Sequence, residues 1–555
     1  MIRLFDTHHI RPMRELDGMW DFKQNGTDKT YQLPVPGCWE QHPDFLTYRG
    51  KGTYTKTVYI KQSGNIRIEF KGVSHTADVY FDGEKIAHHY NAFTPFSAVV
   101  KDVRKGVHTI TVEVDNTFGE HSALHIPNDY YTYGGITRPV ALEYIHDIYI
   151  KNVHFTPKFA DGKWSAKVEV IICNLTTEPI NAGIRIEIAG YEMHGELKIG
   201  GNSETTVTFE SEFDDIKPWS ADSPNLYMLN TELLINGDAV DDLIERVGFR
   251  AVEVRDTKIY LNGEPIYFKG FNRHEDYAVD GCAVTLQHMV QDMDLMQDMN
   301  ANAVRTCHYP NDERFLDLCD ERGIFVWEEN HARGLDIKDM QNPNFERQCE
   351  DCIREMIENH YNHPSIVIWG ILNECASETD DGRRMYKKQY RQIKSMDTSR
   401  PATSATCRHF RDICLDLPDI VSFNMYSGWY EDCDISKRND EEIDWIQKSG
   451  GENKPIIVSE MGAGAVYGYR DRTRVKWSEE RQADIIRDNL EVYMNDDRIT
   501  GVFIWQFADC RVTGEGEWFK VRPRSYNNKG IVDEYRRPKI AYDTVKEMFA
   551  KNRGQ

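Results

Sequence analysis

The sequence predicts three domains: an N-terminal jelly-roll-like β-sandwich, an immunoglobulin-like β-sandwich and a C-terminal (β/α)8 TIM barrel. Short segments that alternate apolar and polar residues fill residues 1–147 and return over 148–254, which is typical of half-buried strands. From residue 255 to 555, continuous apolar segments alternate with helical ones, the pattern of parallel βα units. A chain of 555 residues is also too long for one ordinary core.

The first sandwich, residues 1–147, is indicated by four alternating segments and a turn. The segments are Tyr54–Ile60, Ile66–Phe70, Ala77–Phe81 and His108–Val114. Asp82-Gly83 follows the third segment, and this dipeptide readily adopts the backbone conformation of a tight hairpin. We therefore expect antiparallel strands joined by short turns.

The second sandwich, residues 148–254, repeats the alternation in a smaller unit. Its segments are Ala166–Ile172, Ile184–Ile188 and Thr205–Phe209, and an Asn236-Gly237 turn follows near its end. This spacing of short strands and turns favours an immunoglobulin-like sandwich.

The barrel, residues 255–555, is predicted from eight buried strands separated by helices. The strands are Ile266–Phe271, Asn302–Thr306, Ile324–Glu328, Ser365–Glu374, Pro401–Thr406, Asp419–Asn424, Pro455–Glu460 and Gly501–Phe507. Amphipathic helices are expected over Leu286–Met299, Glu313–Arg322 and Phe345–His360. Eight alternating pairs are what a closed parallel barrel requires.

The composition restricts the partners and the compartment. The 90 acidic residues exceed the 67 lysines and arginines, for a net charge of −23, which argues against nucleic acid and anionic membranes as partners. No apolar run is long enough to cross a bilayer, and no signal-like segment opens the chain. Twelve cysteines are too sparse for a disulfide scaffold, so we expect reduced thiols, a cytoplasmic location and no metal.

Two strands end in a glutamate in a similar way. Ile366–Trp369 is continuously apolar, and the strand then ends in Asn373 and Glu374. The apolar segment that begins at Pro455 ends in Glu460. Placing a carboxylate at the end of a dry strand is costly unless it has a partner or a task. The alternative is that each glutamate is an exposed loop acid.

A barrel would bring these two carboxyl groups together, because active sites of such barrels gather at the carboxyl ends of the strands. Glu374 ends the fourth strand and Glu460 the seventh, so they would face each other across the barrel mouth. Hydrolysis of a glycosidic bond with retention needs two carboxyl groups roughly 5–5.5 Å apart, one as nucleophile and one as acid. The pattern alone does not say which residue takes which role.

Motifs along nearly the whole chain resemble glycoside hydrolase family 2, which contains β-galactosidases, β-mannosidases and β-glucuronidases. The motifs are Pro34–Trp39, Tyr133–Pro139, Trp219–Tyr227, Val247–Arg250, Asn262–Pro265, Gly270–His274, Val304–Pro310, Asn373-Glu374 and Ser459-Glu460. The resemblance implies that Glu374 is the acid/base and Glu460 the nucleophile, that no cofactor is needed, and that the protein forms a homo-oligomer.

The sugar is indicated by Asn527 and Lys529, which are similar to the Asn-x-Lys motif with which β-glucuronidases of this family hold the sugar carboxylate. An ammonium and an amide beside a carboxylate form charge-assisted hydrogen bonds. From residue 511 to 539 eight lysines and arginines face four acids, a local excess of +4 in an acidic chain. On its own, such a basic loop would be ordinary solvated surface.

The resemblance also suggests further substrate-binding residues: Asp129, lent by the first sandwich, together with Tyr426, Tyr430, Trp505, Asn373, His274, His308 and Arg305. Among them, Arg305 is expected to steady the ionised Glu460, and Trp505 to form an apolar wall. For the aromatic residues, the competing interpretation is packing within the core.

Arg333 departs from the glucuronidase pattern, because it follows the third strand where a more neutral sequence is usual. It could contact the hydroxyl at carbon 4 or form a salt bridge to a neighbouring acid. We expect a retaining exo-β-glucuronidase acting on small-molecule or oligosaccharide β-glucuronides through an open entrance. A β-galacturonidase or dual-specificity β-hexuronidase, an enzyme for neutral sugars, and a non-catalytic sugar-binding protein remain alternatives.

Overall fold

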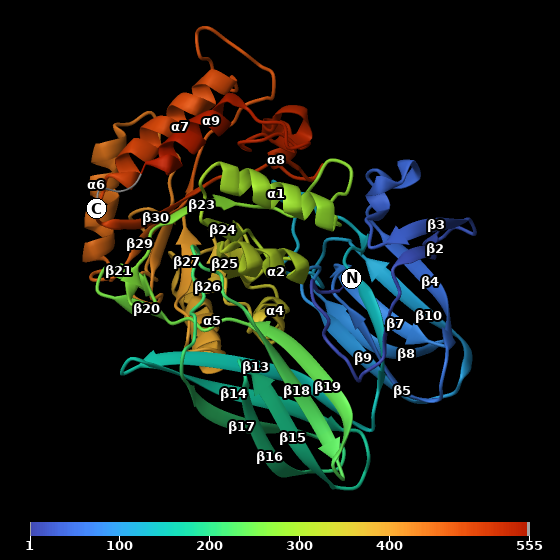
Figure 1. Cartoon of the computed structure of the whole chain (residues 1–555). Coiled ribbons are helices and arrows are strands. Elements are labelled where there is room, and N and C mark those ends of the chain that lie inside the picture. Colours follow the sequence, from blue (N-terminus) through green and yellow to red (C-terminus); the bar gives the residue numbers. More distant parts are fainter. Residues whose placement is uncertain (1, 552–555) are drawn as a thin grey trace.

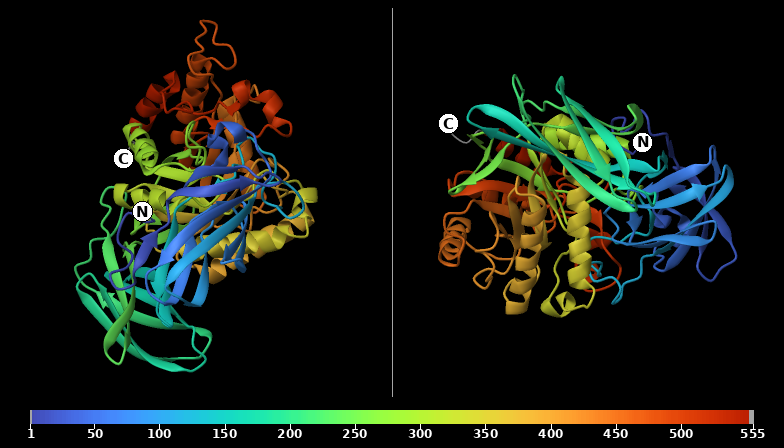
Figure 2. Two further views of the ribbon diagram at one scale, coloured as in Figure 1. Left: turned by 90° about the vertical axis from the view of Figure 1, so that its right-hand side faces the viewer. Right: turned by 90° about the horizontal axis from the view of Figure 1, so that it is seen from below.

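The computed structural model describes residues 2–551 and contains the three predicted domains. Figure 1 shows the first sandwich at one flank of the barrel and the second sandwich beneath both, and the views of Figure 2 agree. The expected fold class, two β-sandwiches followed by a (β/α)8 barrel, is confirmed.

The first sandwich packs two antiparallel sheets around one core. Its strands are β1 (Met13–Glu15), β2 (Gly18–Gln24), β3 (Thr30–Val35), β4 (Lys51–Ile60), β5 (Gly64–Phe70), β6 (Val73–Ser74), β7 (Thr76–Phe81), β8 (Glu84–Tyr90), β9 (Phe96–Val103), β10 (Gly106–Asp115), β11 (Gly135–Ile136) and β12 (Val140–Ile145), with short 3-10 helices at Trp39–Gln41 and Pro43–Phe45. The sheets run in the orders β1-β12-β5-β9 and β3-β2-β4-β10-β7-β8. Trp20, Phe22 and Tyr54 are buried between them, as the inward-facing residues of alternating strands should be.

The second sandwich has sheets of three and four strands, β13-β14-β17 and β16-β15-β18-β19. Its strands are β13 (Ile148–Ala160), β14 (Lys163–Asn174), β15 (Ile180–Ile188), β16 (Tyr191–Ile199), β17 (Ser203–Phe213), β18 (Tyr227–Ile235) and β19 (Asp238–Val247). Along β14 the inward-facing residues Val168, Val170 and Ile172 are fully buried. This period of two is the feature that predicted the strand.

A small sheet leads from the second sandwich into the barrel, which then closes with eight parallel strands in sequence order. The small sheet has β20 (Val252–Arg255), β21 (Lys258–Leu261) and β22 (Glu264–Pro265). The barrel strands are β23 (Phe268–Asn272), β24 (Ala303–Thr306), β25 (Phe325–Glu329), β26 (Ile366–Asn373), β27 (Ala402–Thr406), β28 (Val421–Asn424), β29 (Ile456–Met461) and β30 (Ile499–Ile504).

Helices cover the outside of the barrel (Figure 1). The longer ones are α1 (Leu286–Asp298), α2 (Glu313–Arg322), α4 (Phe345–His360), α5 (Asp380–Met396), α6 (Ile435–Lys448), α7 (Glu479–Met494) and α9 (Ile540–Ala550), and the short α3 (Ile337–Met340) precedes α4. The last long loop contains β31 (Cys510–Arg511), the short α8 (Trp518–Val521), a 3-10 turn (Pro523–Ser525) and β32 (Tyr526–Asn527). On α2, the Asp312 side chain caps the first turn and Gly323 ends the helix at a φ of 69°, a left-handed conformation that suits glycine.

One long loop of the first sandwich, between β10 and β11, leaves its own domain and packs against the barrel. The Tyr130 hydroxyl lies 3.2 Å from Nε2 of His331, and Asn128 Nδ2 donates to the carbonyl of Arg333 at 3.3 Å. Beyond the loop, Arg138 donates to Glu275 at 2.6 Å. These contacts fix a segment of the sandwich at the barrel mouth, and Asp129 lies within it.

No helix of residues 2–551 combines the length and the apolar character that a bilayer span requires.

Candidate active site

A cavity of about 310 Å³ opens at the carboxyl ends of the barrel strands, where catalytic groups of such barrels gather. It is lined by Asp129, Arg333, Glu374, Cys407, His409, Asn424, Tyr426, Tyr430, Glu431, Glu460, Trp505, Trp518, Arg522 and Lys529. All three sections of the chain that carried the predicted chemistry therefore meet at one place: the strand-end glutamates, the basic loop and the loop of the first sandwich.

Glu460, near the end of β29, is buried and accepts two strong hydrogen bonds. Arg305 donates to its Oε1 at 3.0 Å, and the Tyr426 hydroxyl donates to its Oε2 at 2.6 Å. Both donors stabilise the ionised form of the carboxyl group. Glu460 is thus held in position with a negative charge favoured on it.

Arg305 is itself fixed by further hydrogen bonds. Its guanidinium donates to both oxygens of Glu329 at 2.9 Å, to Asn272 at 3.0 Å and to Asn373 at 2.9 Å. Because the arginine is fully buried among these partners, it cannot turn away from Glu460. Asn373 therefore lies beneath the site and supports Arg305 rather than lining the cavity.

Glu374 follows β26 directly and lines the cavity together with Glu460. Its backbone has a φ of 54°, an uncommon conformation for a residue other than glycine that is found at functional sites. Asn424 donates to its Oε1 at 2.9 Å, and Arg333 lies 3.5 Å from its Oε2. Among residues 2–551, Glu374 thus has one amide donor and one cation close by, but no hydroxyl donor like Tyr426.

The two carboxyl groups influence each other. Burial and the negative charge of Glu374 raise the pKa of Glu460 to about 7, against the opposing effects of Arg305 and Tyr426. The carboxyl group of Glu460 therefore ionises near neutral pH.

The other end of the cavity is cationic. Lys529, 2% exposed, donates from Nζ to the Tyr430 hydroxyl at 2.7 Å. Arg522 donates to Asp129 at 2.9 Å and lies 3.5 Å from the same Tyr430 hydroxyl. Asn527 donates to Asp129 at 3.0 Å, so its amide holds this acid and does not line the cavity.

Asp129 connects the cationic end to the catalytic end. In addition to Arg522 and Asn527, it pairs with Arg333 at 3.2 Å. Burial alone would raise the pKa of Asp129, but Arg333, Arg522 and Lys529 lower it well below its usual range. Arg333 in turn reaches Glu374, so one arginine spans the distance between the acid of the sandwich and the strand-end glutamate.

Three family models divide the chain as the three domains do. The sugar-binding domain of glycosyl hydrolases family 2 matches residues 16–145, a second family 2 domain matches 148–250, and the family 2 TIM barrel domain matches 252–553. The chain belongs to glycosyl hydrolases family 2. The resemblance seen in the sequence motifs is confirmed.

Relatives within family 2 include enzymes of differing specificity. A solved β-galacturonidase from Eisenbergiella tayi, bound to galacturonate, is 49% identical with a TM-score of 0.97 and 99% of each chain covered. A β-glucuronidase from Streptococcus agalactiae is 27% identical, with 96% of each chain covered. A β-galactosidase from Thermoanaerobacterium thermosulfurigenes is 30% identical over 91% of this chain and 70% of its own.

Like Asn373 and Asn527, the predicted contacts His274 and His308 lie outside the cavity lining. Trp505 lines the family 2 cavity, but His274 and His308 pack against this indole, with ring centroids 5.4 and 5.0 Å away, and neither lines the cavity. Direct contact of both histidines with a substrate is therefore not supported. Burial lowers the pKa of each well below its usual range, so both are neutral parts of the wall.

Several residues of the site were not singled out from the sequence. They are Glu329, Asn424, Arg522, Trp518, Cys407, His409 and Glu431. Arg522 could have been found from the sequence, since it contributes to the excess of positive charge between residues 511 and 539. Asn424 could also have been found, because it is the last residue of β28. No sequence pattern indicates that Glu329 lies beside Arg305, because this contact depends on how neighbouring strands align.

Cys375, which directly follows Glu374, is a buried core residue. Its Sγ donates to the Asn373 carbonyl at 3.4 Å, and burial raises its pKa to about 12. It is therefore a protonated thiol that packs under the site, and its neighbours give it no chemical role.

Two clusters in the described chain bring together three side chains that could bind a metal: His274, Cys307 and His308, and Asp317, Asp320 and His363. In the second cluster, Asp317 accepts from Arg3 at 2.8 Å and Asp320 pairs with His363 at 2.5 Å. In the first, burial raises the pKa of Cys307 well above its usual value, which disfavours the thiolate that binds metals. We assign no metal to either cluster.

Proposed function

We propose that the protein is a retaining exo-β-galacturonidase that removes terminal β-linked galacturonic acid. The observation that carries this proposal is Arg333, which lies in the cavity between Glu374 and Asp129. The similarity to the Eisenbergiella tayi β-galacturonidase, at 49% identity, supports it. The β-glucuronide that the sequence favoured is less well supported, because the β-glucuronidase from Streptococcus agalactiae is only 27% identical.

The cavity suits the end of a chain. The loop of the first sandwich that carries Asp129 closes one side, and the barrel closes the other. A sugar that fills this closed end can extend only toward the entrance, so the enzyme would act on a terminal residue. This geometry supports the exo mode.

In the proposed mechanism, Glu460 attacks the anomeric carbon while Glu374 protonates the leaving oxygen. A covalent glycosyl-enzyme ester forms as the glycosidic bond breaks, and Glu374 then removes a proton from the water that hydrolyses the ester. Arg305 and Tyr426 each donate to one oxygen of Glu460 and so hold its carboxylate in place. Asn424 positions Glu374, and no cofactor enters the scheme.

The first-formed sugar identifies the stereochemistry. Retention predicts that the β-anomer of galacturonic acid appears first and then mutarotates. Proton NMR of the anomeric signals during the first minutes of hydrolysis measures this directly. If the α-anomer appears first, the assignment of Glu460 as nucleophile is wrong.

The pH dependence of kcat/KM follows from the ionisation of Glu460, which must be a carboxylate to attack. Burial and the negative charge of Glu374 raise the pKa of Glu460 to about 7, so the ionised form is lost as the pH falls through this value. We expect kcat/KM for p-nitrophenyl β-galacturonide to fall about tenfold per pH unit below roughly pH 7. A kcat/KM that stays constant from roughly pH 7 down to about pH 5 would contradict this role of Glu460.

The choice between galacturonide and glucuronide is a choice of the hydroxyl configuration at carbon 4. We predict that Arg333→Ala lowers kcat/KM for the β-galacturonide by about 100-fold, ~2.7 kcal/mol, and lowers it less for the β-glucuronide. The reason is that the Arg333 guanidinium, held by Asp129, is the cavity group most able to distinguish the two positions of this oxygen. Arg384→Ala, an exposed arginine on α5, is the matched control and should leave both values unchanged.

A panel of four p-nitrophenyl substrates tests the proposal: the β-galacturonide, the β-glucuronide, the β-galactoside and the β-glucoside. The galacturonide should have the highest kcat/KM, and both uronides should exceed their neutral counterparts. Equal rates on the two uronides would favour a dual-specificity β-hexuronidase, a possibility that the shared carboxylate end of the cavity supports. Higher rates on the neutral sugars would overturn the proposal.

A further inference from the structure

The ammonium of Lys529 is poorly satisfied for a buried cation. It has three N–H donors, yet within residues 2–551 its one side-chain hydrogen bond is the contact with the Tyr430 hydroxyl. Lys529 is 2% exposed, so water does not readily supply the remaining bonds. Its free donors therefore favour an anionic ligand in the cavity.

Arg522 lies beside the same position and is also incompletely satisfied. One of its terminal nitrogens is held by Asp129, and the other lies 3.5 Å from the Tyr430 hydroxyl. Its buried Nε has no hydrogen-bond partner in the described chain. The Trp518 ring, whose centre is 5.0 Å from the guanidinium carbon, supports its face. Arg522 is thus a fixed, permanently charged group with donors left over.

A single oxygen atom, the Tyr430 hydroxyl, touches both cations. Burial would raise the pKa of Tyr430, but Lys529 and Arg522 lower it below the ordinary value. Tyr430 is 56% exposed, so its ring can swing outward without opening the core. Within residues 2–551, Asp129 pairs with both Arg522 and Arg333, and Lys529 has no carboxylate partner. A ligand carboxylate would therefore neutralise positive charge that remains at this end of the cavity.

We propose that Arg522 and Lys529 together form the carboxylate clamp of the enzyme, and that the Tyr430 hydroxyl occupies the place of the substrate carboxylate until the substrate displaces it. This inference rests on the proposed function and adds to it a second cation and a movable tyrosine. It gives Tyr430, which the resemblance suggested as a substrate-binding residue, a more specific role. A carboxylate offers two oxygens where the phenol offers one, so each cation would gain a stronger partner.

Arg522 has a physical advantage in this role. Burial and the neighbouring Arg522 lower the pKa of Lys529, whereas an arginine remains protonated at every working pH. The clamp therefore keeps a positive charge even where the lysine alone would release its proton. It also fixes the orientation of the carboxylate, because a planar guanidinium binds it in a preferred geometry.

The test compares Arg522→Gln with Arg522→Lys on the p-nitrophenyl β-galacturonide and the matched β-galactoside. Arg522→Gln should lower kcat/KM at least 30-fold more for the galacturonide than for the galactoside, and Arg522→Lys should recover part of this difference. Because Arg522 also holds Asp129, it could act only by positioning this residue. In that case Arg522→Gln would lower kcat/KM equally for both substrates, and that result would overturn the proposal. Arg524→Gln, which removes an arginine paired with Glu534 in the same loop, is the control and should change neither value.

Binding of sodium galacturonate, measured by calorimetry, separates affinity from catalysis. Arg522→Gln should weaken galacturonate binding at least tenfold and galactose binding by less than threefold. Equal weakening of both sugars contradicts the clamp.

The displaced tyrosine has its own test. Tyr430→Phe removes the competing hydroxyl, so KM for the galacturonide should stay the same or fall. A rise in KM of similar size for the galacturonide and the galactoside would mean that the hydroxyl binds the sugar, and the placeholder role would be wrong. The wild-type substrate panel is run first, since a protein inactive on both uronides refutes the proposed function itself and not only the clamp.

Discussion

Glu460→Gln should lower kcat for the β-galacturonide by about 10⁴-fold or more, ~5.4 kcal/mol at the least. The amide cannot form the covalent ester, and the loss of a catalytic nucleophile has effects of this order. This substitution removes the negative charge of Glu460 with little other change, because a glutamine has the same shape and can still accept a hydrogen bond from Arg305. Single-turnover and steady-state rates of purified protein measure the change.

Two controls make this result interpretable. The variant should bind sodium galacturonate with an affinity close to that of the wild type, since Lys529 and Arg522 lie at the other end of the cavity. Its unfolding temperature should also stay within a few degrees. A Glu460→Gln protein that turns over as fast as the wild type would show that this glutamate is not the nucleophile.

Lys529→Ala should cost about 3–4 kcal/mol in transition-state binding of the β-galacturonide, on the order of 10²–10³-fold in kcat/KM. The substrate carboxylate would lose a charged partner in a buried place, and truncating one member of such a pair leaves the other charge uncompensated. The neutral β-galactoside has no such group, so its kcat/KM should fall far less. The ratio of the two values isolates the recognition of the carboxylate.

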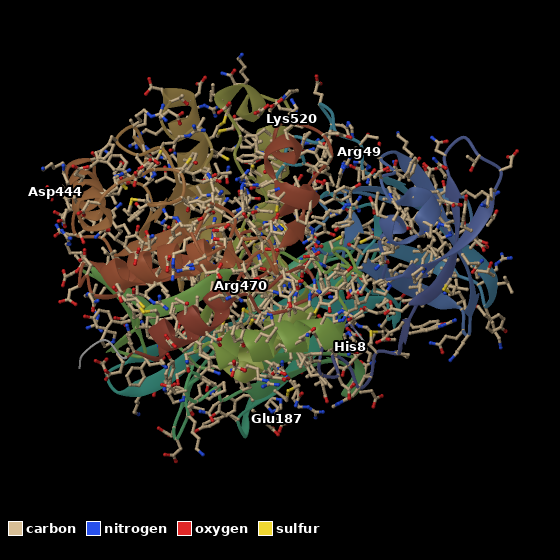
Figure 3. The ribbon with its side chains drawn as sticks, turned by 90° about the horizontal axis from the view of Figure 1, so that it is seen from above. His8, Arg49, Glu187, Asp444, Arg470 and Lys520 are labelled. Carbon is tan, nitrogen blue, oxygen red and sulfur yellow. The ribbon has the colours of Figure 1, made fainter. Side chains whose placement is uncertain are left out.

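Lys520→Ala is the matched control for Lys529→Ala. Lys520 lies at the surface on α8 (Figure 3) and pairs with Glu517 at 2.8 Å, so its removal changes the charge of the same loop without altering the cavity. It should leave both substrates unaffected. If Lys529→Ala lowers kcat/KM equally for the two substrates, Lys529 supports the fold of the site and does not select the uronic acid.

The parts of the fold that the sequence predicted are those that depend on local periodicity. β26 was predicted because Ile366–Trp369 is apolar without interruption, as expected of a strand buried on both faces. α1 was predicted from the amphipathic pattern over Leu286–Met299, and Met289, Met293 and Met296 on its inner face are buried. The last barrel strand was predicted as Gly501–Phe507 but ends at Ile504, because the chain there bends toward the cavity while the apolar pattern continues.

The parts that sequence could not predict depend on contacts between distant segments. Glu329 holds Arg305 only because β24 and β25 are adjacent and in register. Arg522 binds Asp129, 393 positions away in the chain, and no local pattern encodes such a pairing. His274 was assigned to the substrate by resemblance, yet its position against Trp505 depends on how the aromatic side chains pack.

The loop that carries Asp129 makes the barrel domain dependent on the first sandwich. Residues 255–555 hold both glutamates and every cation of the pocket, so they look like a self-sufficient catalyst that could be excised or grafted. A fragment without the first sandwich, however, would lack Asp129, the shared counter-ion of Arg333 and Arg522. Repulsion between the two guanidinium groups would then displace them from their positions in the cavity. The first sandwich is therefore part of the active site, and exchanging either module alone would remove the Asp129 contacts with Arg333 and Arg522.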